Sequence, residues 1–133
     1  MGSVLEIGTG CGYQTAILSS LFDNVVSIER IKTLHLRAKK TLASLNLRNI
    51  TLIHGDGHEG YSKQNHFDAI ILTAAPAKVP DKLLNQLNEH GRMILPLDVN
   101  GSQKLFRFKR TKNGIHKKDI DDVRFVPMLE GIV

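Results

Sequence analysis

The sequence predicts an α/β fold built on one doubly wound, mostly parallel sheet. Three observations indicate this fold class. Short apolar runs alternate with helical patterns, a glycine-rich loop follows the first run, and the run over Phe67–Thr73 is almost unbroken, as is typical of a buried parallel strand. The 133 residues have the length of one domain, so we expect a single domain over residues 1–133.

In the first half of the chain, strands and helices alternate. Apolar runs of strand length predict three strands, and apolar residues at helical spacing predict the two helices between them. These strands are Val4–Ile7, Val25–Ile28 and Ile50–Ile53, and the helices are Tyr13–Phe22 and Ile31 to about Leu45.

The second half continues the pattern and then changes it. Further strands are predicted at Phe67–Thr73, Met93–Leu97, Lys104–Arg110 and Val123–Met128, and a helix at Pro80–Leu87, ended by Asn88–Gly91. A turn at Asn113-Gly114 joins the last two strands, which have no helix between them. We therefore expect that end of the sheet to be antiparallel.

The glycine-rich loop Gly8-Thr9-Gly10-Cys11-Gly12 lies between the first strand and the first helix. Glycine allows tight turns and lets a ligand approach the main chain. A phosphate-binding dinucleotide loop would read G-x-G-x-x-G, whereas this loop reads G-x-G-x-G. Glu6 precedes it, and a carboxylate there disfavours a pyrophosphate and favours a ligand with positive charge, such as an amino group or a sulfonium.

Two acidic residues follow the second and third strands. Glu29 can accept hydrogen bonds from both hydroxyls of a ribose, and Asp56 from an exocyclic amine such as that of adenine. Ligands of doubly wound sheets bind at the carboxyl ends of the strands, so we expect these two residues, the glycine loop and Thr73–Pro76 around one crevice. Together they predict a site for an adenosine with a cationic amino-acid tail, and S-adenosylmethionine is such a molecule.

Other interpretations of these residues stay open. The glycine loop can be a simple turn, Glu29 a solvated strand end and Asp56 a turn residue. Glu6 and the glycine spacing disfavour NAD. The histidines show no metal-ligand spacing with a cysteine or carboxylate, so we expect no metal. Cys11 is expected to be a small residue beside the cofactor and not a nucleophile.

Most of the excess of basic over acidic residues lies in residues 101–133. Along Lys104–Arg110, Phe106 and Phe108 alternate with Arg107 and Lys109, so one strand face is apolar and the other basic. We expect an edge strand that its charges keep soluble and unpaired. Attraction of acidic protein segments is an alternative. Nucleic-acid binding is another, which the lack of an aromatic residue placed for base stacking disfavours.

The segment Val4–Ala16 resembles the protein-L-isoaspartate O-methyltransferases, particularly those of bacteria. The likeness continues over essentially the whole chain, in Ser27–Arg30, His54–Gly57, Phe67–Pro76, Gly91–Pro96 and Val123–Met128. The glycine loop alone indicates only a class I S-adenosylmethionine-dependent methyltransferase, with its Rossmann-like fold. Thr73-Ala74-Ala75-Pro76 and Arg124-Phe125-Val126-Pro127 indicate the narrower family.

The resemblance implies methyl transfer from S-adenosylmethionine to the free carboxylate of L-isoaspartyl residues in damaged proteins. This carboxylate is ionised at neutral pH, so the reaction needs no general base. The resemblance assigns the cofactor to Glu6, Gly8, Thr9, Gly10, Gly12, Glu29, Arg30, Asp56, Gly57, His58 and Thr73. It assigns the substrate peptide to Ala74, Ala75, Pro76, Val126 and Pro127.

Full-length members of the family carry an N-terminal segment ahead of the glycine-loop strand. It holds helices over the cleft and a serine-containing loop that helps to bind the substrate carboxylate. The present chain starts on the first strand, so we assign no catalytic residue and expect weak or no activity from this chain alone.

Two other functions stay open at this stage. One is a class I methyltransferase that acts on RNA or a small molecule, and the other is a cofactor-binding remnant without turnover. Thr73–Pro76 offers no amide or carboxylate to accept from a nucleobase amine. A single cysteine and the lack of a signal or membrane-spanning run favour the cytoplasm and no contact with a membrane. The resemblance implies isoaspartyl-containing proteins as partners, and we expect a monomer.

Overall fold

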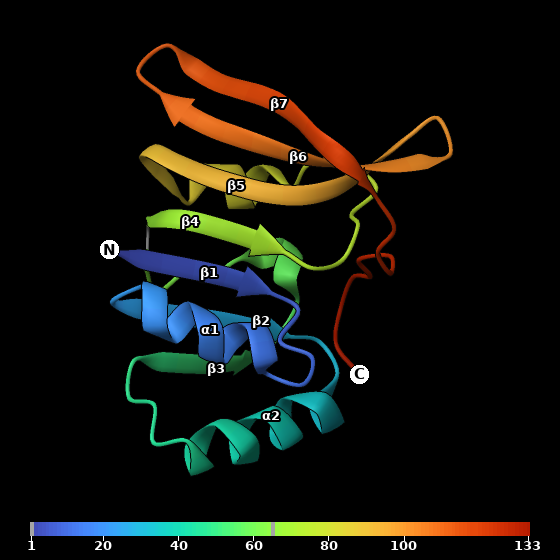
Figure 1. Ribbon diagram of the computed structural model, residues 1–133. Coiled ribbons are helices and arrows are strands. Elements are labelled where there is room, and N and C mark those ends of the chain that lie inside the picture. Colours follow the sequence, from blue (N-terminus) through green and yellow to red (C-terminus); the bar gives the residue numbers. More distant parts are fainter. Residues whose placement is uncertain (1, 65) are drawn as a thin grey trace.

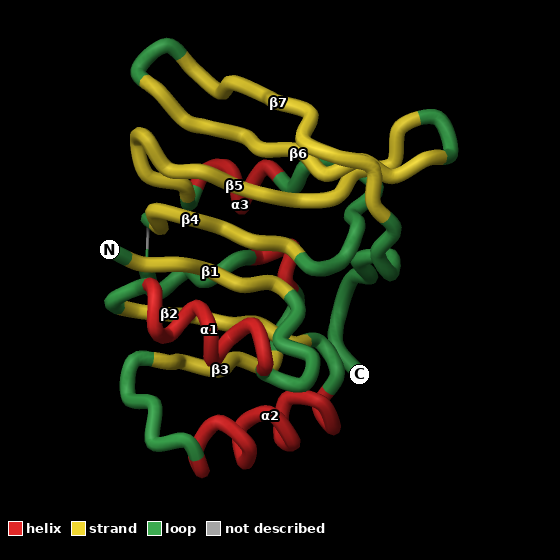
Figure 2. The backbone as a smooth tube through the Cα atoms, in the orientation of Figure 1, coloured by secondary structure: helices red, strands yellow, loops and turns green. Residues whose placement is uncertain are grey.

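The computed structural model describes residues 2–64 and 66–133, which form one seven-stranded sheet with helices on both faces (Figures 1 and 2). The strands are β1 (Ser3–Ile7), β2 (Asn24–Glu29), β3 (Ile50–His54), β4 (Phe67–Leu72), β5 (Leu87–Val99), β6 (Ser102–Thr111) and β7 (Gly114–Val123). The helices are α1 (Tyr13–Leu21), α2 (Lys32–Ser44) and α3 (Asp81–Asn85), with a 3-10 turn η1 (Gly57–Glu59).

The strand order is β3-β2-β1-β4-β5-β6-β7. Neighbouring strands from β3 to β5 are parallel, whereas β6 is antiparallel to both β5 and β7. The structure thus confirms the predicted doubly wound sheet and its antiparallel end. The chain steps outward from β1 to β3 and returns to β4 on the other side of β1. This reversal leaves the carboxyl ends of β1 and β4 side by side, where such sheets bind ligands.

Apolar side chains pack against both faces of the sheet. The larger cluster lies on the α3 side, where Phe67, Leu83 and Met93 are fully buried and Phe106 and Phe108 complete it. A smaller cluster of Val4, Leu18 and Val25 lies beneath α1. The central strands are apolar on both faces because both faces are covered there.

The prediction of a seventh strand at Val123–Met128 is wrong. β7 occupies Gly114–Val123, because the chain turns back immediately after β6 and pairs with it along the whole hairpin. Nearly every residue of β7 is exposed, so it lacks the apolar alternation that marks a half-buried strand. The segment 124–133 instead crosses the carboxyl edge of the sheet and forms an isolated bridge between Ala75 and Pro127.

The predicted helix Pro80–Leu87 is too long, and the predicted strand Met93–Leu97 is too short. Leu87 already belongs to β5 and pairs with Phe67 of β4. Both side chains are almost completely buried, and this burial fixes the strand register at that point. Asn88–Gly91, expected to end the helix, continue the strand.

The prediction that Lys104–Arg110 forms an edge strand is also wrong, because β6 lies between β5 and β7. The alternation of apolar and basic side chains along β6 is as predicted. Phe106 and Phe108 are buried in the larger cluster, and Arg107 and Lys109 lie on the opposite face. The exposed and highly charged β7 forms the edge of the sheet instead.

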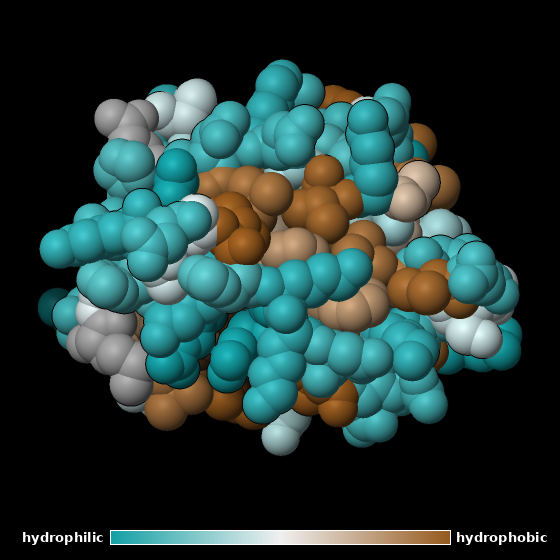
Figure 3. Space-filling view, turned by 90° about the horizontal axis from the view of Figure 1, so that it is seen from above, coloured by the Kyte–Doolittle hydropathy of each residue, from teal (hydrophilic) through white to brown (hydrophobic). Residues whose placement is uncertain are grey.

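The surface on the side of β7 is mostly hydrophilic, but an apolar area lies at its centre (Figure 3). Apolar side chains are therefore accessible on this side of the molecule. Within residues 2–64 and 66–133, no helix combines the length and the apolar character that a membrane span requires.

Asn49 joins the end of α1 to the start of β3, and we predict that Asn49→Ala lowers the free energy of unfolding by about 1–3 kcal/mol. Its Nδ2 donates to the carbonyls of Ser19 (2.8 Å) and Phe22 (3.0 Å). Carbonyls at a helix end have no partner within the helix, so the substitution leaves them unsatisfied. Urea denaturation measures the loss. Arg48→Ala, at the exposed neighbouring position, is the control and should change stability by less than about 0.5 kcal/mol; equal losses would contradict the assignment.

Candidate functional site

A cavity of about 490 Å³ opens at the carboxyl ends of β1, β2 and β4, where the strand order reverses. This size falls in the range of small-molecule sites. The walls come from the ends of these strands, the glycine loop, the start of α2, η1 and the C-terminal segment. The lining residues are Ile7, Gly8, Gly10, Ile28, Glu29, Arg30, Ile31, Leu34, Gly57, Thr73, Ala74, Val126, Pro127, Met128 and Leu129.

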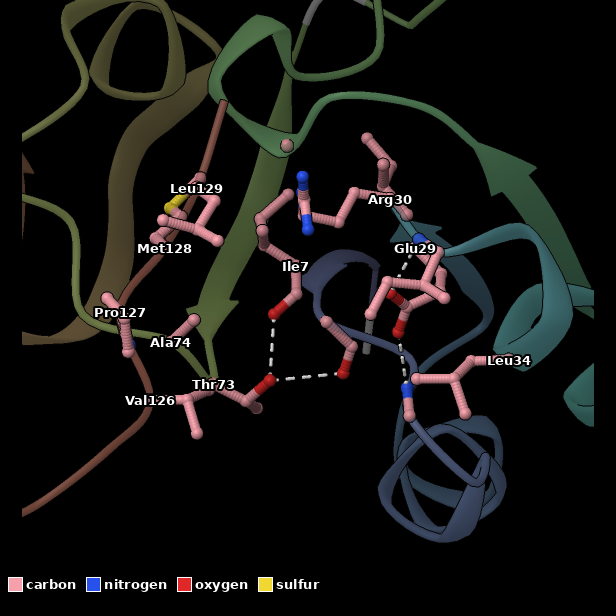
Figure 4. Close-up of a pocket in the computed structure, with 15 residues that line it drawn as sticks. Ile7, Glu29, Arg30, Leu34, Thr73, Ala74, Val126, Pro127, Met128 and Leu129 are labelled. Atoms are coloured by element: carbon pink, nitrogen blue, oxygen red, sulfur yellow. Dashed lines mark hydrogen bonds between the residues drawn. The ribbon is translucent and has the colours of Figure 1, made fainter. Parts of the chain in front are cut away.

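The glycine loop forms the wall of the cavity next to β1. Gly8 and Gly10 have φ angles of 100° and 56°, and residues other than glycine rarely adopt positive φ values. A Cβ atom on Gly8 would lie 2.2 Å from Oγ1 of Thr73, whereas one on Gly10 would enter open space. The Thr73 hydroxyl lies 2.9 Å and 3.0 Å from the carbonyl oxygens of Ile7 and Gly8, and this contact joins β4 to the loop (Figure 4).

Glu29 is the acidic side chain among the lining residues. Its Oε1 accepts a hydrogen bond from the backbone N–H of Gly10 (2.9 Å), and its Oε2 accepts one from that of Ile31 (3.0 Å) (Figure 4). The residue is only 6% exposed, so these bonds fix the carboxylate at the cavity wall. A carboxylate has about four lone-pair sites, which leaves each oxygen able to accept once more. Two fixed acceptor oxygens suit a pair of neighbouring hydroxyls.

Glu6 does not line the cavity, contrary to the sequence prediction. It is completely buried beneath the glycine loop, where Thr15, Ser27 and Gln14 donate hydrogen bonds to its carboxylate. The hydroxyl of Ser27 also lies 2.6 Å from that of Thr9, which ties the loop to the same network. Burial raises the pKa of Glu6, and the three hydrogen bonds offset this only in part. Glu6 therefore supports the loop from below.

Asp56 and His58 also lie outside the lining. Oδ1 of Asp56 accepts from the backbone N–H of His58 and faces the Nδ1 atom of its ring, both at 2.9 Å, and Oδ2 accepts from the N–H of Gly131 (3.0 Å). Partial burial acts to raise the pKa of Asp56, but these hydrogen bonds outweigh it and the pKa is lowered. η1 and the C-terminal segment thus each engage one oxygen of the carboxylate expected to accept from an adenine amine.

The C-terminal segment 124–133 closes one side of the cavity. Two backbone hydrogen bonds attach it to Ala75 (2.7 Å and 2.8 Å). Two more join Val133 to Arg30 and Lys32 (2.9 Å and 2.7 Å). The side chains that this segment contributes to the lining are those of Val126, Pro127, Met128 and Leu129.

The structure gathers some predicted site residues and separates others. Those that line the cavity are Gly8, Gly10, Glu29, Arg30, Gly57, Thr73, Ala74, Val126 and Pro127. Those that do not are Glu6, Thr9, Gly12, Asp56, His58, Ala75 and Pro76. Gly12 is buried at the start of α1, where a Cβ atom would lie 3.3 Å from Leu42. Ala75 and Pro76 are buried behind Ala74.

The lining residues that sequence reasoning missed are apolar: Ile7, Ile28, Ile31, Leu34, Met128 and Leu129. Ile7 and Ile28 directly precede Gly8 and Glu29 at the ends of their strands. Their positions could therefore have predicted that they line the cavity. Leu34 belongs to the apolar stripe of α2, which the sequence attributes to the core, and no local pattern separates the two roles.

The fold and the site define a class of proteins. A sheet whose order reverses at β1, with a glycine loop after β1 and a fixed acidic residue at the end of β2, is that of the class I S-adenosylmethionine-dependent methyltransferases. A solved protein-L-isoaspartate O-methyltransferase superposes with a TM-score of 0.91 at 29% identity, over 98% of this chain and 43% of that chain. A putative protein-L-isoaspartate O-methyltransferase from Plasmodium falciparum, solved with S-adenosyl-L-homocysteine, gives 0.80 at 25% identity, over 96% and 66%.

Sequence comparison identifies the family. The family model for protein-L-isoaspartate(D-aspartate) O-methyltransferase matches residues 1–132. A protein-L-isoaspartate O-methyltransferase from Pseudoalteromonas atlantica is 51% identical over 129 residues, which are 97% of this chain and 60% of that protein. One from Pseudomonas paraeruginosa is 47% identical over 131 residues, 98% and 62% of the two chains. The chain belongs to the protein-L-isoaspartate O-methyltransferase family, as its motifs predict, and spans about 60% of the length of these relatives.

Removing the buried charge of Glu6 should change how stability depends on pH. An acid whose pKa is raised on folding binds its proton more tightly in the folded state, so ionisation destabilises the fold as pH rises from the ordinary pKa, here 4.5, to the raised one. In Glu6→Gln, the half-buried Gln14 can turn its amide to pair with the new side chain. We predict that wild type loses stability relative to this variant as pH rises through that window.

Urea denaturation at several pH values between about 4 and 7 measures this difference. Glu6→Ala is the matched variant. It leaves the hydroxyls of Thr15 and Ser27 without their acceptor, so it should destabilise the protein by at least about 2 kcal/mol across the whole range. A difference between wild type and Glu6→Gln that does not change with pH would contradict the buried charge.

Proposed function

We propose that the cavity binds S-adenosylmethionine and that the protein transfers its methyl group to the free carboxylate of L-isoaspartyl residues in damaged proteins. The observation that carries this proposal is the Glu29 carboxylate, held by Gly10 and Ile31 at the wall of an otherwise mostly apolar cavity. The family supports the reaction class, because the relatives are named for it.

The lining fits an adenosine with an extended cationic tail. The two oxygens of Glu29 can accept from the ribose hydroxyls, while the apolar surfaces of Ile28, Leu34 and Met128 suit the faces of a purine ring. At Gly10 the absence of a side chain leaves room for the ligand beside the main chain. Because Gly57 lines the cavity and Asp56 does not, the adenine amine would meet the backbone around Gly57 or water instead.

The chain's own residues would position the reactants without transferring a proton. S-adenosylmethionine, when bound, supplies an electrophilic methyl group on its sulfonium. The contacts of Thr73 with Ile7 and Gly8 fix the floor beside the proposed methyl position. The apolar side chains of the C-terminal segment would keep water out. An isoaspartyl carboxylate is already ionised, so alignment of its oxygen with the methyl carbon is the main requirement.

The mouth of the cavity offers a surface for the substrate peptide. Val126 is 68% exposed although it lines the cavity, and Pro127 and Ala74 lie next to it. We propose that these three residues contact the peptide, with Ala75 supporting them through its backbone hydrogen bonds to the C-terminal segment. We also propose that residues 1–133 act as one cytoplasmic domain and bind isoaspartyl proteins as a monomer.

The experiment compares two peptides that differ only in the linkage of one residue, L-isoaspartyl or L-aspartyl. Radiolabelled S-adenosylmethionine and an enzyme concentration equal to that of the peptide make slow transfer detectable. We predict methylation of the isoaspartyl peptide and at least about tenfold less of the aspartyl isomer. Glu29→Ala should weaken S-adenosylmethionine binding at least about tenfold in calorimetry, because a charged acceptor of two hydroxyls is lost, whereas the remote Glu89→Ala should not.

The outcomes separate the competing functions. Equal methylation of both peptides, or transfer to RNA instead, would indicate another class I methyltransferase. Binding of S-adenosylmethionine without any transfer would indicate a cofactor-binding remnant. If Glu29→Ala binds the cofactor as wild type does, the site assignment itself is wrong.

A further inference from the structure

The C-terminal segment 124–133 is attached to the fold on both sides of the cavity (Figure 1). On the β4 side, Ala75 holds it through two backbone hydrogen bonds. On the β2 side, the N–H of Val133 donates to the carbonyl of Arg30 (2.9 Å), and the carbonyl of Val133 accepts from the N–H of Lys32 (2.7 Å). Leu129 lies between these two attachments and lines the cavity. Release of the β2-side attachment therefore opens one side of the cavity.

The carbonyl of Val133 also serves as a cap for α2. Lys32 is the first residue of this helix, and N–H groups in a first helical turn have no partner within the helix. Among the described residues, no side chain caps α2 at Ile31. Release of Val133 thus leaves the Lys32 N–H without its acceptor, so the amide of Lys32 reports whether this end of the segment is attached.

A histidine of β3 strengthens the β2-side attachment. Nε2 of His54 lies 3.0 Å from the carbonyl oxygen of Arg30 and 3.3 Å from that of Val133. Carbonyl oxygens can only accept, so Nε2 carries the hydrogen and donates to both. His54 therefore bonds to the same two carbonyls that join the segment to the region between β2 and α2.

The ring of a second histidine, His35 of α2, stacks on that of His54. The ring centroids are 5.8 Å apart, and the ring planes differ by 28°. Nδ1 of His35 is buried and has no hydrogen-bond partner in the part of the chain that the structure describes. Burial lowers the pKa of His35, and His54 and Lys39 lower it further, while Glu29 acts in the opposite direction. The stacked arrangement thus favours an uncharged His35.

The attachment should therefore weaken in acid. The charged side chains of the surrounding segments are of both signs: Glu29, Arg30, Lys32, Lys39, Asp56 and Glu130. With these groups in place, the folded state still binds a proton on His35 more weakly than the unfolded chain does. The stacked arrangement consequently loses stability as pH falls from 6.5, the ordinary pKa of histidine, to the lowered value.

We propose that His54 is a positioning residue that holds the C-terminal segment over the cavity, and that a proton on His35 drives the two rings apart and releases the segment from the β2 side. The movement takes Nε2 of His54 away from the carbonyls of Arg30 and Val133. The cavity then opens beside Glu29, and a bound ligand exchanges faster in acid. The release itself is a property of the fold, and only its effect on S-adenosylmethionine rests on the proposed function.

Hydrogen exchange of backbone amides, followed by NMR in the ligand-free protein, tests the release. Each exchange rate is divided by that of an unstructured chain at the same pH, which removes the pH dependence of the exchange chemistry. The Lys32 amide reports the β2 side, and the Met128 amide, which donates to Ala75, is the reference on the β4 side. We predict that the protection of Lys32 relative to Met128 falls at least about fivefold from about pH 7.5 to about pH 5.5.

Four variants separate the roles of the two histidines. His35→Phe keeps a stacked ring without a site for the proton, so it should abolish the pH dependence. His54→Phe removes the donor and should lower the protection of Lys32 at both pH values, whereas His54→Gln keeps an N–H donor and should largely preserve it. His116→Phe, on the exposed strand β7, is the control and should behave as wild type does.

Protection of Lys32 that does not change with pH, pH dependence that persists in His35→Phe, or wild-type protection in His54→Phe would each overturn the proposal. The dissociation rate of S-adenosyl-L-homocysteine, measured by stopped flow, should rise in acid for wild type and not for His35→Phe. Failure to bind this ligand, with the predicted change at Lys32, would contradict the proposed function alone. Binding without that change would contradict the release alone.

Discussion

The carboxylate of Glu29 connects three parts of the molecule at the end of β2. One oxygen accepts from Gly10 in the glycine loop and the other from Ile31 at the start of α2. These bonds set the distance between the loop and α2, and with it the width of the cavity between them. The same two oxygens are the polar groups that the proposed ribose would meet. The shape of the site and its chemistry therefore depend on one side chain.

A second buried carboxylate, that of Glu6, makes this arrangement possible from beneath. Its partners Thr15 and Ser27 come from α1 and β2, and Thr9 joins the network through Ser27. Glu6 thus holds the loop against the sheet, while Glu29 fixes the side of the loop that faces the cavity. Each acid lies in a segment that resembles the family, but the fold gives Glu6 a supporting role and leaves Glu29 at the cavity wall.

What the sequence could predict follows from how local each feature is. The strand from Phe67 onward was predictable because a buried parallel strand is apolar on both faces. Gly8, Gly10 and Glu29 were predictable because a position at the carboxyl end of a strand already determines where the residue lies. The position of β7 was not predictable, because an exposed edge strand shows no alternation of apolar and polar residues. In the same way, Leu34 lines the cavity although its pattern is that of a core residue.

The orientation of side chains was harder to predict than their position. Glu6 and Asp56 both lie near the carboxyl edge, as expected, yet neither lines the cavity. Ser27, 21 residues away, donates to Glu6, and Gly131, 75 residues away, donates to Asp56. Such partners are set by the tertiary fold, and no local pattern in the sequence reveals them.

The most direct test of this account asks whether Glu29 accepts the ribose hydroxyls. The measurement is a thermodynamic cycle with S-adenosyl-L-homocysteine and its 2′-deoxy analogue, titrated by calorimetry into wild type and Glu29→Ala. We predict that wild type binds the deoxy analogue at least about tenfold more weakly, about 1.4 kcal/mol, and that Glu29→Ala no longer distinguishes the two ligands. The same discrimination in both proteins would contradict the role of Glu29 as acceptor of the ribose hydroxyls.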